Sequence, residues 1–268
     1  MSLAFWNGRT TAASEVWIDP GDSGFLFGDG LFETLRVDDG KARDVEAHLD
    51  RLYAGLARVR IAIPEDKERL ADAVATVAAA APRPVARLRI TITSGRASGR
   101  TQGRDEPTRL ITAVPYEPPA AELYRDGVAV RLLPQYRIDS GGPLAGLKSL
   151  SYQSYRLALE RAESLGAFEA LLLNVQGKLA DGSRSNVALV FPEGIFTPPR
   201  NDGCLPGTVR RRLLERGAIN EWPLSQEDLA MASEVLLMNS LIGVLPVAKV
   251  NGRGIPVGTT AARLRDLL

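Results

Sequence analysis

Three prolines within five residues interrupt this chain near its middle, and this stretch restricts the possible folds strongly. Pro115, Pro118 and Pro119 lie within residues 115–121. Proline fixes φ and lacks a backbone N–H, so the stretch can continue neither a helix nor a central strand, and it forms a stiff connection. The 268 residues suffice for more than one domain. We therefore expect a smaller N-terminal domain over residues 1–114, a linker over 115–121 and a larger C-terminal domain over 122–268.

The first half of the chain alternates strand patterns with helix patterns. Leu88, Ile90 and Ile92 alternate with polar residues, which predicts a strand with one wet face. Leu49, Leu52 and Leu56 recur at helical spacing. Applied to the whole half, these rules predict strands over residues 16–18, 31–37, 87–93 and 110–114, and helices over 45–57 and 65–81.

Strands outnumber helices in the second half. The predicted strands cover residues 128–133, 169–174, 186–191 and 235–238, and the predicted helices cover 151–165 and 206–216. The sequence therefore predicts an α+β fold with an N-terminal α/β domain and a strand-rich C-terminal domain.

Two segments bear on a membrane or secreted location. The apolar stretch 235–250 is shorter than the roughly 20 residues that a spanning helix needs. It is also interrupted by polar residues, glycine and proline, so it is better read as a buried strand pair. Residues 1–11 lack the apolar core of a signal peptide. We therefore expect a cytoplasmic protein that does not contact membranes.

Charge and composition exclude several functional classes. Thirty-three Lys and Arg against 32 Asp and Glu leave a net charge of +1, so no overall field attracts nucleic acid. The single cysteine, Cys204, can form neither an internal disulfide nor a zinc cluster. The single histidine, His48, argues against a multi-histidine metal site and a Ser-His-Asp triad. Any catalysis must rest on Lys, Arg, Asp, Thr and Tyr.

Lys148 is the strongest candidate for covalent catalysis. It lies between Leu147 and Leu150, just before a predicted helix. An apolar setting and the positive end of a helix dipole both disfavour a charged ammonium group, which suits a lysine that forms a Schiff base. The alternative is an exposed loop lysine, which is the more common case.

Other segments allow both a functional and a structural interpretation. Residues 24–34 are glycine-rich, but a strand follows them, so a tight turn is favoured over a phosphate loop. The helix that opens within residues 205–210 could hold a phosphate on its first amides, or it could be plainly capped. Asp181 could pair with a protonated ring nitrogen, or it could belong to a turn. His48 and Arg51 lie one helical turn apart and could simply be surface groups.

Seven motifs, taken together and in order, resemble the fold-type IV family of pyridoxal-phosphate enzymes. This family includes branched-chain aminotransferases, D-amino-acid aminotransferases and 4-amino-4-deoxychorismate lyases. The motifs are Gly-Asp-Gly-Leu-Phe-Glu-Thr (28–34), Glu-Ala-His-Leu-Asp-Arg-Leu (46–52), Leu-Lys-Ser-Leu-Ser-Tyr (147–152), Glu-Ala-Leu-Leu-Leu-Asn (169–174), Gly-Ser-Arg-Ser-Asn (182–186), Thr-Pro-Pro (197–199) and Leu-Pro-Gly-Thr-Val-Arg (205–210). The resemblance implies a D-amino-acid-aminotransferase-like two-domain architecture, pyridoxal 5'-phosphate as cofactor, a small-molecule substrate and a homodimer.

The resemblance also implies roles for individual residues. Lys148 is similar to the Schiff-base lysine, and Asp181 to the acidic residue near the pyridine nitrogen. Asp181 stands where family members usually have glutamate, so its shorter side chain must reach the ring through a backbone shift or through water. The remaining cofactor contacts implied are Arg51, the amides of Gly207, Thr208 and Val209, the Ser240 hydroxyl, and Tyr152 near the phenolic oxygen.

The resemblance favours a lyase over a transaminase. Thr34 stands where branched-chain aminotransferases typically have glycine and lyases have threonine, and Asn239 lies in a lyase-like loop. Arg100 matches an arginine that binds the substrate carboxylate in lyases, with Arg96 less favoured. We therefore expect conversion of 4-amino-4-deoxychorismate to 4-aminobenzoate and pyruvate, a folate-biosynthesis reaction, with Lys148 and Thr34 as catalytic residues. The alternatives are an aminotransferase acting on D- or branched-chain amino acids, and a non-catalytic binding protein.

Overall fold

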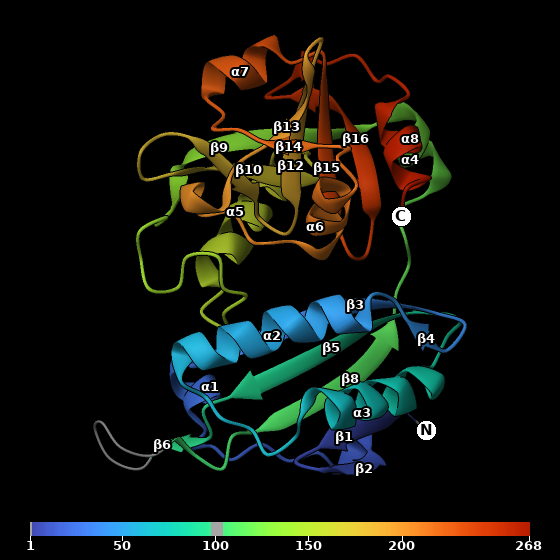
Figure 1. Cartoon of the computed structure of the whole chain (residues 1–268), viewed down its shortest axis with the longest axis vertical. Helices are drawn as coiled ribbons and strands as arrows, with labels where there is room; N and C mark the ends of the chain where they lie inside the picture. The colour runs from blue at the N-terminus through green and yellow to red at the C-terminus, as the bar shows by residue number, and fades with distance from the viewer. Residues whose placement is uncertain (1, 98–103) are drawn as a thin grey trace. The chain divides into compact units, whose positions relative to one another are not determined.

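The computed structural model describes residues 2–97 and 104–268, which form two compact units (Figure 1). The first unit comprises Met1–Glu117 together with Leu147–Tyr152, and the second comprises Pro118–Gly146 together with Gln153–Leu268. The first division of the chain, between Glu117 and Pro118, lies within the stretch expected to be a linker. The segment that carries Lys148 groups with the first unit, whereas the sequence predicts it in the C-terminal domain.

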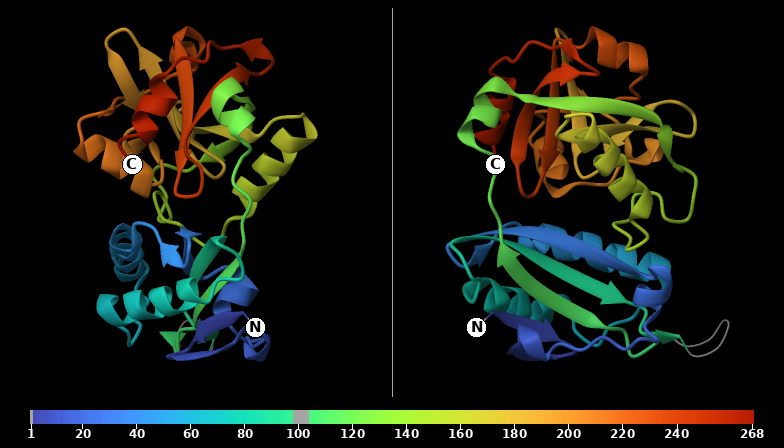
Figure 2. Two further views of the ribbon diagram at one scale, coloured as in Figure 1. Left: turned by 90° about the vertical axis from the view of Figure 1, so that its right-hand side faces the viewer. Right: turned by 180° about the vertical axis from the view of Figure 1, so that it is seen from behind.

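The first unit is a six-stranded antiparallel sheet with two helices packed on one face, as both views in Figure 2 show. Its strand order is β2-β1-β8-β5-β3-β4, formed by β1 (Leu3–Trp6), β2 (Arg9–Ala12), β3 (Gly30–Asp38), β4 (Lys41–Ala42), β5 (Val85–Thr93) and β8 (Arg109–Pro115). The covering helices are α2 (Val45–Val59) and α3 (Lys67–Ala79), and the short helix α1 (Ser23–Phe27) precedes β3.

Alternation along the strands gives this sheet one apolar and one polar face. Leu31, Leu35 and Val37 of β3 point into the core, where they pack with the leucines of α2. Thr34 and Arg36 face the other side, where Thr34 pairs with Arg89 and Arg36 with Arg87 across β3 and β5. The two faces of β3 therefore serve different purposes, packing on one side and polar contacts on the other.

The second unit is a mixed nine-stranded sheet, of which β11-β10-β9-β16-β15-β12-β13-β14 is the main order and β17 pairs with β16. The strands are β9 (Val128–Ile138), β10 (Glu169–Asn174), β11 (Leu179–Gly182), β12 (Asn186–Phe191), β13 (Gly194–Thr197), β14 (Asn220–Glu221), β15 (Glu234–Asn239), β16 (Gly243–Val250) and β17 (Arg253–Gly254). The helices are α4 (Ala121–Asp126), α5 (Gln153–Ser164), α6 (Thr208–Glu215), α7 (Gln226–Met231) and α8 (Thr260–Arg265).

Most predicted elements are present, with one clear error. The predicted strands 169–174 and 186–191 coincide with β10 and β12, and 235–250 forms the antiparallel pair β15–β16. Residues 16–18, predicted as a strand, lie outside every helix and strand of the described chain. The run is short and is followed by Asp19-Pro20, so it pairs with nothing, and Trp17 is 60% exposed. Throughout residues 2–97 and 104–268, no helix combines the length and apolarity needed to cross a membrane.

Candidate active site

The Lys148 segment is attached to the beginning of β3. The Phe32 amide donates to the Lys148 carbonyl at 2.9 Å, and the Leu150 amide donates to the Gly30 carbonyl at 2.9 Å. An antiparallel bridge joins Leu31 to Ser149 between these two bonds. The backbone of Lys148 is therefore fixed as an additional short pairing on this sheet, which explains why the segment belongs to the first unit.

Aromatic rings surround the Lys148 side chain. Its Nζ lies 4.6 Å from the centroid of the Phe32 ring and 5.9 Å from that of Tyr152, and the two rings meet edge to face at 5.4 Å. Lys148 is half-buried rather than an exposed loop lysine. The two rings provide the apolar setting of Lys148. Helix α5 begins only at Gln153, so Lys148 does not lie next to its N-terminus as the sequence predicts.

Arg51 and His48 converge on one buried carboxylate. Arg51 Nε donates to Glu33 Oε1 at 2.7 Å, and Arg51 Nη2 lies 2.5 Å from Glu33 Oε2. His48 Nδ1 lies 2.7 Å from the same Oε2, and Glu33 is only 1% exposed. The interpretation of His48 and Arg51 as surface groups is therefore wrong, because Glu33 on the core face of β3 holds both side chains inside the unit.

Burial and neighbouring charges together determine the protonation of Glu33 and His48. Burial by itself would raise the pKa of Glu33, but the Arg51 charge and the hydrogen bonds from Arg51 and His48 outweigh it and lower that pKa to about 2. Burial lowers the pKa of His48, and the charges of Arg51 and Lys148 act in the same direction. At neutral pH, Glu33 is thus ionised and His48 is neutral, with its Nδ1–H directed at Glu33.

Thr34 lies on the polar face of β3, beside an arginine that the sequence analysis did not single out. Arg89 is directly opposite Thr34 on β5, and its guanidinium lies 3.9 Å from the Phe32 ring centroid. Arg89 Nε donates to Thr91 Oγ1 at 3.1 Å. Phe32 is therefore flanked by both Arg89 and Lys148. The alternation of β5 indicated that Arg89 is polar-facing, but only the strand register places it opposite Thr34.

Of the two arginines proposed for the substrate carboxylate, Arg96 is the one that the structure describes. Arg100 lies outside the described residues. Arg96 is well exposed, with its side chain 73% accessible, and its Nε is 3.7 Å from Asp19 Oδ2.

In the second unit, Asp181 is buried at the end of β11 and engaged by two donors. Its Oδ2 accepts from the Leu205 amide at 2.9 Å, and its Oδ1 accepts from Asn186 Nδ2 at 2.9 Å. Burial raises the pKa of Asp181 to about 7, although these hydrogen bonds and the charge of Arg210 oppose the shift. Asp181 is therefore an acid that gains or loses its proton near neutrality, and a cationic neighbour would favour its ionised form.

The beginning of α6 lies next to Asp181. Asn186 Nδ2 also donates to the Leu205 carbonyl at 2.8 Å, so one amide group joins β11 to the approach to α6. Gly207 is the N-cap, and a Cβ there would lie 1.9 Å from Asn186 Oδ1. Within the described chain, no side chain caps this helix, whose first residues are Thr208 and Val209. Asn186 thus joins Asp181 to the segment that leads into α6, whose first amides are predicted to bind a phosphate. The sequence did not indicate this role of Asn186.

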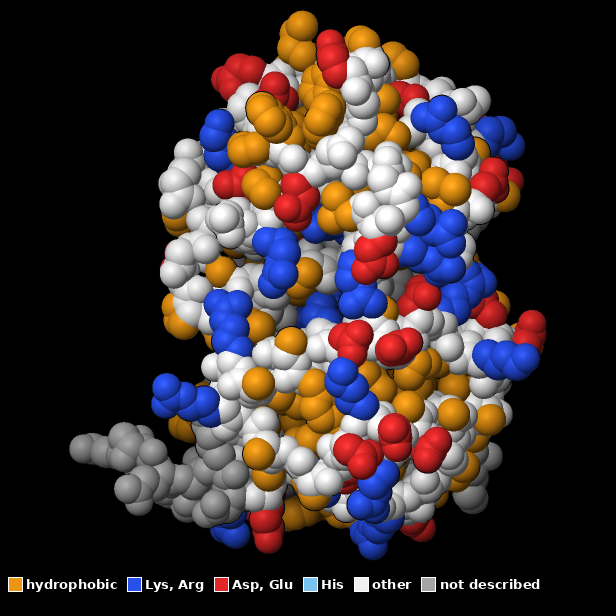
Figure 3. All heavy atoms as spheres, viewed as in Figure 1, with side chains coloured by type: hydrophobic (Ala, Val, Ile, Leu, Met, Phe, Trp, Pro, Cys, Tyr) orange, Lys and Arg blue, Asp and Glu red, His pale blue; other side chains and the backbone are white. Residues whose placement is uncertain are grey.

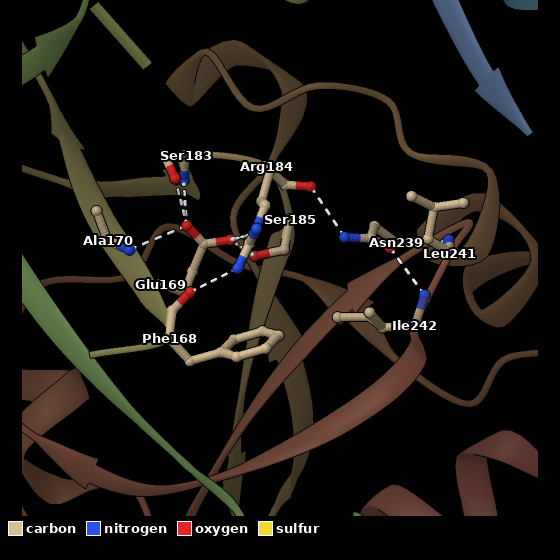
Figure 4. Close-up of polar contacts among 9 residues, drawn as sticks. All are labelled: Phe168, Glu169, Ala170, Ser183, Arg184, Ser185, Asn239, Leu241 and Ile242. Carbon is tan, nitrogen blue, oxygen red and sulfur yellow. Dashed lines mark hydrogen bonds and ion pairs between the residues drawn. The ribbon is translucent and has the colours of Figure 1, made fainter. Parts of the chain in front are cut away.

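Ser240 lies in the turn between β15 and β16, and Asn239 organises that turn. The Oδ1 of Asn239 accepts from the amides of Leu241 at 2.9 Å and Ile242 at 3.0 Å, and its Nδ2 donates to the Arg184 carbonyl at 3.1 Å (Figure 4). Arg184 belongs to the Gly-Ser-Arg-Ser-Asn motif that follows Asp181. The turn with Ser240 is therefore attached to the segment next to Asp181.

These features fit a pyridoxal phosphate. The helix start has no room for a Cβ at Gly207, and its first-turn amides, at Thr208 and Val209, are of the kind that suits a phosphate, while the Gly207 amide donates to the Leu205 carbonyl at 2.8 Å. In the same turn, the buried Arg210 has an Nε that makes no hydrogen bond to any described residue, while its Nη2 pairs with Glu221 at 2.5 Å. Asp181 supplies a carboxylate for a ring nitrogen, and Lys148 supplies an amine in an apolar setting. Among the described residues, no group of three or more His, Cys, Asp or Glu side chains could hold a metal ion.

Comparison with known proteins identifies the family. Residues 30–250 match the family model of amino-transferase class IV. A putative branched-chain-amino-acid aminotransferase of Methanocaldococcus jannaschii is 30% identical over 277 residues, which cover 98% of this chain and 93% of that protein. The crystal structure of 4-amino-4-deoxychorismate lyase from Pseudomonas aeruginosa has a TM-score of 0.87 and 30% identity, covering 98% of this chain and 97% of that one.

A third match bears on the cofactor. The PLP-bound form of a hypothetical aminotransferase from Mycobacterium tuberculosis has a TM-score of 0.84 and 26% identity, covering 99% of this chain and 96% of that one. The α+β class IV architecture and the pyridoxal phosphate cofactor, both predicted from the sequence motifs, are confirmed. The chain belongs to the class IV aminotransferase family of pyridoxal-phosphate enzymes.

Proposed function

We propose that this protein is an aminodeoxychorismate lyase, which converts 4-amino-4-deoxychorismate to 4-aminobenzoate and pyruvate. The observation that carries the proposal is the position of Thr34, which lies on the polar face of β3 opposite Arg89 and next to the ring that contacts Lys148. A hydroxyl and a guanidinium suit a substrate with carboxylates better than a branched aliphatic side chain. The lyase of Pseudomonas aeruginosa supports the same assignment. In this proposal the enzyme is cytoplasmic.

The proposal assigns the cofactor contacts residue by residue. Lys148 would hold the cofactor covalently, and Asp181 would face its pyridine nitrogen. The other proposed contacts are Arg51, Tyr152, Ser240 and the helix-start residues Gly207, Thr208 and Val209. When bound, pyridoxal phosphate supplies an electron sink for the electrons of the broken C–H bond.

The side chains around Lys148 would perform the proton transfers. Lys148 Nζ removes the proton from the ring carbon that bears the substrate amine, and the neighbouring C–O bond breaks. The released enolpyruvyl group becomes pyruvate by taking up a proton, which Lys148 or Thr34 delivers. Arg89 would hold a substrate carboxylate, a role that the resemblance gives to Arg100. Because the product ring is aromatic, the protein has chiefly to orient the C–H bond and exclude water, as the Phe32 and Tyr152 rings would do.

One experiment tests this reaction against transamination. The purified holoenzyme is given 4-amino-4-deoxychorismate without any keto acid, and 4-aminobenzoate and pyruvate are measured. We expect equal amounts over many turnovers, because elimination returns the cofactor to its starting form. Turnover of D- or branched-chain amino acids that requires 2-oxoglutarate, with no 4-aminobenzoate formed, would overturn the lyase assignment.

Transamination is the second candidate, and the relative from Methanocaldococcus jannaschii favours it. That putative branched-chain-amino-acid aminotransferase is as similar in sequence as the Pseudomonas aeruginosa lyase, at 30% identity in each case. An aminotransferase needs a second half-reaction with a keto acid, so it would stop after one turnover in the experiment above.

Borohydride reduction of the holoenzyme, followed by peptide mapping, tests the part of the proposal that both reactions share. We expect the pyridoxyl group on the peptide that contains Lys148. An adduct on a different lysine would refute the site while leaving the family assignment intact.

A further inference from the structure

A buried carboxylate holds the turn that follows Asp181. Glu169 of β10 is 0% exposed, and its Oε1 accepts from the Ser183 amide at 3.1 Å and from the Ser183 hydroxyl (Figure 4). Its Oε2 accepts from the Ser185 hydroxyl at 2.8 Å. Burial raises the pKa of Glu169, and a carboxyl group buried this deeply is costly without hydrogen-bond donors. Two serines of one turn provide donors, together with the Ala170 amide at 2.9 Å, and Arg184 Nε lies 3.8 Å from Oε2. The turn is thereby fixed to β10 on both sides of Arg184.

Arg184 points its side chain back toward β10 and its carbonyl away from it. Its Nη2 donates to the Phe168 carbonyl at 2.7 Å, and its guanidinium lies 4.8 Å from the centroid of the Phe168 ring. The Arg184 carbonyl accepts from Asn239 Nδ2 (Figure 4). Glu169, through Ser183 and Ser185, therefore fixes the position of the Arg184 carbonyl. This carbonyl is the group to which Asn239 donates.

The Asn239 amide is directed to backbone groups at both ends. Its oxygen accepts from the amides of Leu241 and Ile242, and its nitrogen donates to Arg184. A side-chain amide offers two donor hydrogens and an oxygen with two lone pairs, so both acceptor sites of Asn239 are used by the turn that contains Ser240. With one Nδ2 hydrogen also bonded to the Arg184 carbonyl, backbone groups of two turns fix the orientation of the Asn239 amide.

We propose that Asn239 is a positioning residue that sets the Ser240 hydroxyl for the phosphate of the cofactor. It does so by joining the turn of residues 239–242 to the turn of residues 182–186, which Glu169 holds in place. The inference rests on the proposed role of Ser240. It replaces the substrate contact that the family resemblance implies for Asn239, because the contacts of this amide run to Arg184, Leu241 and Ile242.

The chain contains a matched control for this proposal. Asn174 Oδ1 accepts from the amides of Gln176 at 3.0 Å and Lys178 at 2.9 Å, and its Nδ2 donates to the Asp202 carbonyl at 3.2 Å. Asn174 thus makes the same three kinds of bond as Asn239, in the same unit, on a turn without a proposed cofactor contact. Asn239→Ala and Asn174→Ala should destabilise the fold by comparable amounts.

The test compares the binding of pyridoxal phosphate and of pyridoxal, which lacks the phosphate, to the full-length apoprotein. In Asn239→Ala we expect the Kd for pyridoxal phosphate to rise about tenfold, as for the loss of one good hydrogen bond, with the Kd for pyridoxal unchanged. Asn174→Ala should leave both constants unchanged. In a Ser240→Ala background, Asn239→Ala should add less than a twofold change. At saturating cofactor, the KM of Asn239→Ala should match that of the wild type.

Several outcomes would overturn the proposal. A higher KM for substrate with unchanged cofactor affinity would make Asn239 a substrate contact. Equal weakening of pyridoxal and pyridoxal phosphate binding, or equal effects of Asn174→Ala and Asn239→Ala, would show that the phosphate is not the target. If Ser240→Ala alone leaves the affinity for pyridoxal phosphate unchanged, the assignment of Ser240 fails, and the positioning role fails with it, while the lyase reaction and Lys148 remain testable by product formation and peptide mapping.

Discussion

Glu33 orients the Arg51 side chain through two hydrogen bonds. It accepts hydrogen bonds from the Nε and Nη2 of Arg51, one on each carboxylate oxygen. His48 is neutral and shares the same carboxylate, so it adds a hydrogen bond without adding positive charge. The two contacts with Glu33 therefore fix the orientation of the Arg51 guanidinium.

Replacing Arg51 should weaken cofactor binding more than replacing its anchor. Arg51→Ala removes a charged hydrogen-bond partner worth about 1.5–3 kcal/mol, and Glu33→Gln leaves the guanidinium in place but less constrained. We expect a large rise in the Kd for pyridoxal phosphate in the first variant and a smaller rise in the second, measured by titration of the apoprotein. Glu65→Gln is the control, because it breaks a buried pair with Arg109 elsewhere in the first unit. Unchanged affinity in Arg51→Ala would leave Arg51 with a structural role only.

Asp181 gives the apoprotein a pH dependence of known sign. Its pKa is raised by burial from 3.8 to about 7, so the folded state binds a proton that the unfolded state has released. This contribution to stability is present at low pH and declines as pH rises through 7. The stability of Asp181→Asn relative to wild type, measured by urea unfolding of apoprotein, should therefore increase between pH 5 and pH 8.

The same substitution should slow catalysis, because amide nitrogen cannot favour a protonated pyridine ring as a carboxylate does. Full activity of Asp181→Asn would mean that the shorter side chain does not reach the ring. A relative stability that stays constant with pH would contradict the raised pKa.

At the scale of elements, continuous apolar runs were predictable and side-chain partners were not. Strands β10 and β12 have apolar residues on both faces, a pattern that bounds them closely from sequence. The polar partners depend on register and on turns between distant strands. Arg89 meets Thr34 only because β3 and β5 pair as they do, and Asn186 meets Asp181 through the turn between β11 and β12. The motifs of the family, rather than periodicity, predicted Lys148, Arg51 and Asp181 as site residues.

The start of α6 offers a test at this scale. Gly207→Ala would place a Cβ 1.9 Å from Asn186 Oδ1, so either the helix start or Asn186 must move. We expect loss of cofactor affinity and a destabilisation of about 1–3 kcal/mol, typical of overpacking, measured by cofactor titration and urea unfolding. Gly254→Ala is the control, since a Cβ there meets no atom within 4 Å. Wild-type affinity in Gly207→Ala would exclude close approach of a phosphate to this helix start.

At the scale of the whole molecule, the exposed charged and apolar side chains bear on which partners the protein binds. On the face shown in Figure 3, basic and acidic side chains both occur over each unit. The short helix α1, in contrast, presents Phe25, Leu26 and Phe27 at 73%, 49% and 70% exposure. Such a patch is typical of a surface that another chain covers.

We therefore expect a homodimer that depends on α1. Sedimentation should give twice the mass of one chain, and Phe25→Ser together with Phe27→Ser should shift the protein toward the monomer. The paired substitution of the exposed Leu157 of α5 and Met231 of α7, both in the second unit, is the control. A monomeric wild type would reject the dimer, whereas a dimer that survives the paired α1 substitution would place its interface on other residues.

The chain leaves the first unit at Glu117, returns for Leu147–Tyr152 and then leaves again. When only the first 117 residues have been synthesised, the segment Leu147–Tyr152 that pairs with β3 is still missing. Lys148, the residue proposed to hold the cofactor, is missing with it. The first unit is finished only after the opening strand of the second, β9, has also been made. Neither unit corresponds to one uninterrupted stretch of gene, so a simple truncation or exchange of halves at the proline-rich stretch separates Lys148 from the sheet that positions it.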